Sequence, residues 1–150
     1  MKPELVDYKP EHAIRILEEY ARSEETILLA GQDPEGFVTN HQLSGPAWTL
    51  LLGDRPIGCG GIIICAWHNG LAWLLLSKLF YSNIRTTVKL IRQYLETTAE
   101  KHELVRVELE TVASSATNAR FAEWLGFELE GLKRSYGPNG EDFFLFGRIF

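Results

Sequence analysis

An apolar run that leads into an amphipathic segment constrains this chain more than any other stretch. Residues Leu71–Leu76 are all apolar and follow the turn residues 68–70, which predicts a strand buried on both faces. From Ile84 to Ala99 the apolar residues recur every three or four positions, which predicts a helix. Polar residues collect between the two. Because the first N–H groups of a helix lack intrahelical partners and its dipole is positive there, this junction is suited to binding phosphate.

Length and composition indicate an ordinary soluble domain. The 150 residues are enough for one domain with a proper core, spanning residues 1–150, and 45% of them are hydrophobic. The longest apolar runs are too short to cross a bilayer, and the chain begins with no secretory signal pattern, so we expect a cytoplasmic protein with no membrane partner. The net charge of −5 argues against nucleic acid as a partner.

The cysteine and histidine spacings predict neither a disulfide nor a metal site. Cys59 and Cys65 are six residues apart in one predicted strand, about 20 Å when extended, which is too far for a disulfide. We expect both to be reduced core residues. His41 and His68 have no second ligand at a zinc-like spacing. The four tryptophans are expected in the core or at an interface.

The first half of the chain predicts two helices and a strand meander. A short strand at 5–8 precedes a helix that begins at Pro10, and a second short helix is expected at 24–30 before a loop at 32–46. Three antiparallel strands follow at 47–52, 55–67 and 71–79, and Asn69-Gly70 is a strong hairpin signal between the last two. Gly58, Gly60 and Gly61 predict a bulge or a close backbone approach in the middle strand.

The second half predicts alternating strands and helices. After the helix that ends at Lys101, residues 105–111 alternate in polarity, residues 114–125 are helical, and strands are expected at 127–136 and 143–149. A strand–helix–strand passage implies a parallel pair between 71–79 and 105–111 with a right-handed crossover. The fold class is therefore α/β with a mixed sheet.

Two stretches resemble the GNAT-type N-acetyltransferases. In residues 47–61 a turn is followed by Pro56-Ile57-Gly58, which is similar to the second and third strands of that family. Residues 125–131, Leu-Gly-Phe-Glu-Leu-Glu-Gly, and the turn at 136–142 resemble its last helix and closing hairpin. With the order β-α-α-β-β-β-α-β-α-β-β, the resemblance covers nearly the whole chain and implies a mixed central sheet with helices on both faces.

The resemblance implies an acyl-coenzyme A donor, usually acetyl-CoA, and an amine acceptor. The thioester would lie where the strands at 71–79 and 105–111 separate. Backbone N–H groups of the first of these strands would hold the pantetheine and polarise the acetyl carbonyl, which needs no particular side chain. This implied main-chain site comprises Leu76, Ser77, Lys78 and Leu79.

The expected pyrophosphate loop departs from the family pattern (Gln/Arg)-x-x-Gly-x-(Gly/Ala). Arg85 stands where a glycine is expected, and Thr87 stands where Gly or Ala is expected. Since glycine lets backbone approach phosphate closely, we expect a wider approach or contacts through hydroxyls and the Arg85 guanidinium. The candidate cofactor-binding residues are Ser82, Asn83, Ile84, Arg85, Thr86 and Thr87 at the junction, and Ser115, Asn118 and Phe121 in the next helix. Lys78, Lys89 and Arg92 extend a basic path, or form a solvated helix face.

The usual proton donor of the family is missing. The tyrosine expected four residues before the glycine of Leu-Gly-Phe is Ala122, and the asparagine expected seven residues before that is Ser115. Tyr136, which we expect on the sixth strand with Arg134 on the same face, is the substitute candidate; the alternative is a tyrosine at a sheet end with a solvated hydroxyl. Asp142 orients a substrate or, as we favour, completes a turn.

Glu108 and Glu110 are candidates for the general base. A buried carboxylate has a raised pKa and can take a proton from an ammonium group. The alternative is an ion pair with Arg106 on the same face, or an exposed edge. In the loop, Asp33, Glu35 and His41 could select a cationic acceptor, although we favour ordinary surface polarity as their explanation.

The resemblance therefore implies an acetyl-CoA-dependent N-acetyltransferase that works by direct transfer, and we expect no metal. The alternative is a catalytically inactive GNAT-like module that binds a ligand or a protein, and an aminoacyl or longer acyl donor also stays open. The acceptor is a protein N-terminus, a lysine, a polyamine or a small amine. Exposed strand edges and four tryptophans are compatible with a homodimer.

Overall fold

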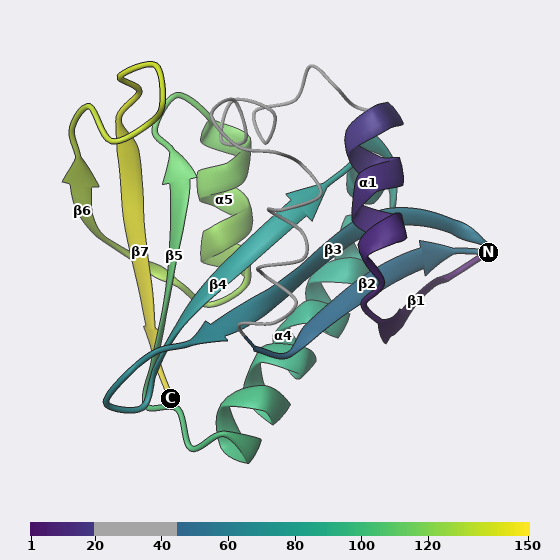
Figure 1. The fold of residues 1–150 in the computed structure, drawn as a ribbon, viewed down its shortest axis with the longest axis horizontal. Helices are drawn as coiled ribbons and strands as arrows, with labels where there is room; N and C mark the ends of the chain where they lie inside the picture. Colours follow the sequence, from purple (N-terminus) through teal and green to yellow (C-terminus); the bar gives the residue numbers. More distant parts are fainter. Residues whose placement is uncertain (20–44) are drawn as a thin grey trace.

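A seven-stranded sheet forms the centre of the molecule (Figure 1). The computed structural model describes residues 1–19 and 45–150. The strand order is β1-β2-β3-β4-β5-β7-β6. The elements are β1 (Pro3–Asp7), α1 (Pro10–Glu19), β2 (Ala47–Leu52), β3 (Arg55–Ile64), β4 (Asn69–Leu76), the 3-10 helix η1 (Lys78–Asn83), α4 (Ile84–Lys101), β5 (Arg106–Val112), α5 (Ala116–Trp124), β6 (Glu128–Lys133) and β7 (Phe143–Ile149).

The predicted mixed sheet is confirmed. β1 to β4 pair antiparallel in chain order, β4 and β5 pair parallel across the α4 crossover, and β7 lies between β5 and β6 in antiparallel pairing. The meander follows from short turns between its strands, and the parallel pair follows from the intervening helix. The predicted turn at 68–70 is displaced: its residues are Trp67 and His68, and Asn69 and Gly70 belong to β4.

Helices cover both faces of the sheet, as predicted (Figure 1). One face packs against the buried side of α4, with Ile91, Leu95 and Ala99, and against Phe121 and Leu125 near α5. The other face packs against Ala13 and Ile16 of α1. Burial of the predicted apolar stripe therefore fixes α4 on the sheet.

Three strands are shorter than predicted. β3 ends at Ile64 because Trp67 and His68 adopt positive φ angles of 59° and 60°, which close the turn before β4. β4 ends at Leu76, and residues 78–83 form η1 instead of extending the strand. β6 ends at Lys133, and Ser135 has a φ of 53°. Backbone in the left-handed region cannot continue a strand.

The glycines of β3 have the two roles that the sequence predicts. The register with β2 shifts between Leu50 and Leu51, which places a bulge beside Gly58. A Cβ on Gly60 would lie 2.6 Å from the Trp73 carbonyl oxygen and 2.7 Å from Cζ2 of Trp48. Gly60 is therefore required by a close approach of neighbouring groups.

The cysteine prediction is half right. Both thiols are free, and Cys59 is buried, but Cys65 is exposed because it follows the end of β3. The tryptophan prediction is also only half right: Trp48 and Trp73 are buried, whereas Trp67 and Trp124 are exposed.

Several predictions fall outside the described residues. These are the helix at 24–30, most of the loop at 32–46, and the candidates Asp33, Glu35 and His41. Among the described helices, none has the length and apolar character that a bilayer crossing requires.

We expect Gly60→Ala to lower the free energy of unfolding by about 1–3 kcal/mol, because the new methyl group would overlap atoms of three neighbours, Trp48, Trp73 and Leu74. The measurement is urea denaturation of the purified protein. Gly131→Ala on the edge strand β6 is the matched control, since no atom lies within 4 Å of its added Cβ. Equal stability of the two variants would contradict the packing described for β3.

Candidate functional site

The parallel strands β4 and β5 separate after a short ladder. Only three residue pairs are in register: Asn69 with Arg106, Gly70 with Val107, and Leu71 with Glu108. β4 continues to Leu76 and β5 to Val112 without further pairing to each other. The predicted separation of these two strands is therefore confirmed.

Backbone groups of β4 face the unpaired side. The N–H of Ser77 donates to the Ile57 carbonyl on the β3 side, at 3.0 Å. Because hydrogen-bonding directions alternate along a strand, the N–H groups of Leu74 and Leu76 point toward β5. Of the four main-chain candidates at 76–79, Leu76 thus faces the gap in the ladder, the Ser77 amide is used by β3, and Lys78 and Leu79 belong to η1.

Two buried hydroxyl groups near the separated strands lack partners. Ser77 directly follows β4, and Thr111 lies on the part of β5 that does not pair with β4. Their side chains are buried, and neither Oγ of Ser77 nor Oγ1 of Thr111 has a hydrogen-bond partner among the described residues. Such groups are uncommon in folded proteins, and a ligand that supplies the missing bond is one explanation.

The junction before α4 is helical and not an open phosphate loop. η1 runs from Lys78 to Asn83, and α4 begins at the next residue. Thr87 is buried, and its hydroxyl donates to the carbonyls of Asn83 and Ile84 at 3.1 and 3.0 Å. The Asn83 side chain does not cap the helix. Ser82, Arg85 and Thr86 are exposed.

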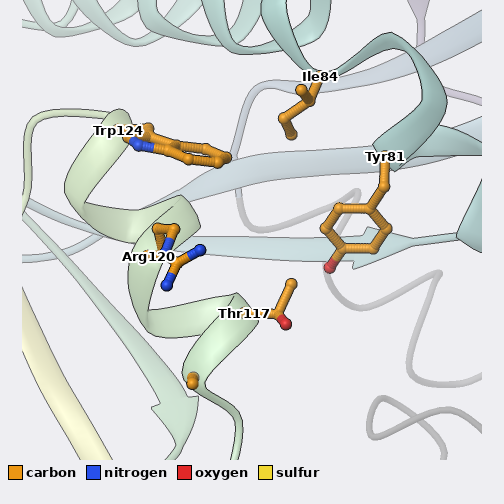
Figure 2. Close-up of a pocket in the computed structure, with 6 residues that line it drawn as sticks. Tyr81, Ile84, Thr117, Arg120 and Trp124 are labelled. Atoms are coloured by element: carbon orange, nitrogen blue, oxygen red, sulfur yellow. The ribbon is translucent and has the colours of Figure 1, made fainter.

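A pocket of about 230 Å³ lies between this junction and α5 (Figure 2). Figure 2 shows Arg120 and Trp124 of α5 on one side, with Tyr81 of η1 and Ile84 of α4 across from them. The lining residues are Tyr81, Ile84, Ala116, Thr117, Arg120 and Trp124. Of these, only Ile84 is a sequence-based candidate. Ala116, Arg120 and Trp124 are four residues apart, so the sequence places them on one side of a helix but does not place them at a pocket.

The three predicted residues of α5 shape the surroundings of this pocket. Ser115 is the N-cap, and its Oγ accepts from the Asn118 N–H at 3.1 Å. The Tyr81 hydroxyl donates to Oδ1 of Asn118 at 3.3 Å, which links η1 to α5. Phe121 is buried and packs edge-on against Phe80, with ring centroids 5.0 Å apart.

The residues of the predicted basic path have different surroundings. Arg92 donates from Nη1 to the Trp124 carbonyl at 3.0 Å, so it caps the end of α5. Lys78, Arg85 and Lys89 are exposed. Arg92 therefore has a structural contact that the sequence pattern does not reveal.

Glu108 and Glu110 lie on the sheet face opposite α4 and α5. Val107 and Leu109 belong to the core beneath those helices, so the alternate residues point the other way. Arg106 donates to Glu108 at 2.9 Å and to Glu130 at 2.6 Å, and Lys133 donates to Glu110. Glu108 therefore forms the ion pair with Arg106 that the alternative interpretation predicts.

These contacts shift the pKa values of several groups. Hydrogen bonds from Arg106 lower the pKa of Glu130, and the bonds to Glu130 and Glu108 raise the pKa of the Arg106 guanidinium. The hydrogen bond that Lys133 donates to Glu110 raises the pKa of Lys133. Burial, and then Glu110, raise the pKa of Tyr136. The shifts of Arg106, Glu130 and Lys133 all favour their charged forms.

Tyr136 follows β6 and is not on the strand, so its predicted position is wrong. It is 52% exposed, its ring packs edge-on against Phe143, and Nζ of Lys133 lies 4.5 Å from its centroid. The turn interpretation of Asp142 is confirmed, because its Oδ1 accepts from the Ser135 N–H at 2.9 Å. Within residues 1–19 and 45–150, no three His, Cys, Asp or Glu side chains gather as a metal would require.

Comparison with solved structures identifies the architecture. Ard1 from Thermoplasma volcanium superposes with a TM-score of 0.81 at 12% identity, over 99% of this chain and 98% of that one. A GNAT-family acetyltransferase from Streptococcus pneumoniae gives a TM-score of 0.73 at 15% identity, over 99% of both chains. This chain has the GNAT fold.

Other GNAT-fold structures agree. The ribosomal L7/L12 alpha-N-protein acetyltransferase RimL, solved in complex with coenzyme A, has a TM-score of 0.73 at 12% identity and covers 100% of this chain and 95% of its own. No family model matches the sequence, and no curated protein matches it. The likeness is therefore one of fold, and the site must be argued from the residues of this chain.

We expect Thr111→Val to raise the free energy of unfolding of the ligand-free protein by about 1–3 kcal/mol, because valine keeps the shape and removes a buried hydroxyl without a partner. Thr49→Val is the control: the buried Thr49 hydroxyl lies 3.0 Å from Nδ1 of His12, and its loss should destabilise the fold. Urea denaturation measures both. A destabilised Thr111→Val protein would mean that the hydroxyl is already satisfied.

Proposed function

We propose that this chain is an acyl-CoA-dependent N-acyltransferase that moves an acetyl group from acetyl-CoA to an amine. The observation that carries the proposal is the separation of β4 and β5 after Leu71 and Glu108, which leaves β4 amides unpaired toward the gap in the ladder. A pantetheine arm carries amide and carbonyl groups that can complete such a broken ladder. The GNAT fold supports the same donor class.

The donor would bind between the separated strands and extend past η1 and α5. The N–H groups of Leu74 and Leu76 would bond to the pantetheine and to the thioester carbonyl. The unpartnered hydroxyls of Ser77 and Thr111 offer two further polar contacts along this path. The phosphates would then lie beyond Tyr81, at the level of the pocket that Arg120 lines.

The reaction would be a direct transfer. The neutral amine attacks the thioester carbon, and the carbonyl oxygen takes the negative charge of a tetrahedral intermediate held by β4 amides. The carbon–sulfur bond then breaks, and the coenzyme leaves as a thiolate that takes up a proton. Holding both reactants in place supplies much of the rate enhancement.

The acidic cluster on the opposite face suits the acceptor. An ammonium acceptor must lose a proton before it attacks, and Glu108 and Glu110 are the candidate bases on that face. Glu110 is the stronger candidate because it adjoins Tyr136, the candidate acid. Tyr136 would return a proton to the thiolate. The acceptor class stays open among protein N-termini, lysines, polyamines and small amines.

One specific observation favours a second function, a GNAT-like module that binds without catalysis. Ala122 takes the position of the family's tyrosine acid and is buried in the core, so it supplies no proton. Such a module would bind coenzyme A or a protein partner and release no free thiol.

We expect acetyl-CoA at 100 times its Kd to stabilise the protein by about 2.7 kcal/mol in a thermal unfolding assay, because it binds only the folded state. We also expect release of free coenzyme A thiol with at least one acceptor from a panel of N-terminal peptides, a lysine peptide, spermidine and a small aromatic amine.

The two readouts separate the alternatives. Stabilisation without thiol release for any acceptor would favour the non-catalytic module. Absence of any thermal shift at millimolar acetyl-CoA would contradict donor binding itself. A Glu110→Gln variant should keep the thermal shift and lose the thiol release, since its carboxylate is assigned to the acceptor and not to the donor.

A further inference from the structure

The pocket beside α5 contains an unusual combination of charge and apolar surface. Arg120 is the one charged side chain among the described residues that line it, and the others include Tyr81, Ile84 and Trp124. Within the described part of the chain, the Arg120 guanidinium has no ion pair or hydrogen bond. A guanidinium with two donor edges free, set among rings and an aliphatic side chain, is suited to an anionic group attached to an apolar one.

The start of α4 is poorly arranged for the same anion. The residues directly before α4 form the helix η1 and not a glycine loop whose backbone could approach a phosphate. The Thr87 hydroxyl is also occupied, because it donates to the carbonyls of Asn83 and Ile84. Arg85 is exposed, but successive helical residues point about 100° apart. Ile84 lines the pocket, and Arg85 is not among its described lining residues.

The order of residues along the pocket matches an extended donor. Tyr81 and Thr117 come soon after the unpaired ends of β4 and β5, respectively. Arg120 is about one helical turn further along α5 than Thr117, and Trp124 is another turn beyond it. A volume of about 230 Å³ is below the range of about 300–1,000 Å³ for a site that holds a whole small molecule, so one section of a longer ligand fits here.

We propose that Arg120 of α5 holds the diphosphate of the acyl-CoA donor, in place of backbone at the start of α4, and that Trp124 packs against the nucleoside end. The inference rests on the proposed function. It transfers the phosphate contact from Arg85 and the junction residues, where the sequence places it, to a side chain on a different element. It also explains why the chain needs no glycines in the expected loop, since a side chain and not the backbone would contact the diphosphate.

The test is isothermal titration of coenzyme A, dephospho-coenzyme A and pantetheine into the wild type and the Arg120→Gln variant. We expect Arg120→Gln to weaken coenzyme A binding at least tenfold, as loss of charge-assisted hydrogen bonds to an anion requires. Dephospho-coenzyme A keeps the diphosphate and should lose the same factor. Pantetheine has no phosphate and should bind within twofold of its wild-type affinity.

Two matched variants serve as controls. Arg85→Gln removes the exposed arginine of the α4 first turn and should change coenzyme A affinity less than threefold. Arg134→Gln removes an exposed arginine beyond β6 and should change nothing. Arg120→Lys keeps the charge and loses the planar fork, so its affinity should fall between those of wild type and Arg120→Gln; it also serves if Arg120→Gln does not fold.

Each contrary outcome has a distinct meaning. Coenzyme A affinity within twofold of wild type in Arg120→Gln would overturn this inference and leave donor binding intact. Equal loss for pantetheine would show that Arg120 only shapes the pocket. Loss confined to coenzyme A, with dephospho-coenzyme A unchanged, would assign Arg120 to the 3′-phosphate and overturn the diphosphate assignment. Wild type that binds none of the three ligands would contradict the proposed function itself.

Discussion

The end of hydrogen bonding between β4 and β5 is the constraint on which the site depends. Each strand is fully paired on its outer side, β4 with β3 and β5 with β7, so the inner edges can part without dissolving the sheet. Parting leaves backbone N–H and C=O groups unpaired, and such groups need water or a ligand to satisfy them. The sheet therefore carries a stable scaffold and an unsatisfied edge in the same pair of strands.

The two faces of this edge carry different chemistry. Beneath α4 and α5 the surroundings are apolar, and the nearest pocket offers one cation, Arg120, among its described lining residues. On the opposite face, Arg106, Lys133 and the carboxylates of β5 and β6 form a paired network. Under the proposed function, an anionic donor and a cationic acceptor would approach from opposite sides, which keeps their charges apart until the acyl group is transferred.

The elements with regular patterns were predictable, and the junctions were not. The α4 stripe follows directly from residue spacing, and Asn69-Gly70 marks the β3–β4 hairpin to within two residues of its turn. No sequence pattern predicts η1, because its residues mix polar and apolar types without a clear period. The segment is held by Phe80, which is fully buried. Positive φ angles at Trp67, His68 and Ser135 end strands where no glycine marks the turn. Local propensity does not report these tertiary effects.

The candidate site shows the same division. Residues near the separated strands could be named because the strands themselves could be recognised. Arg120 and Tyr81 could not, since the pocket exists only where η1 and α5 meet in space. The Arg106–Glu108 pair could be named from the sequence, but the second carboxylate on Arg106, Glu130, could not, because it is 24 residues away along the chain.

Residue-resolved hydrogen exchange by NMR tests the central claim most directly. The account predicts that the amides of Leu74 and Leu76 exchange much faster than those of Trp73 and Leu75, which face β3, and that saturating coenzyme A slows Leu74 and Leu76 specifically. Equal protection of all four amides in the free protein would contradict the account, because β4 would then be paired on both sides.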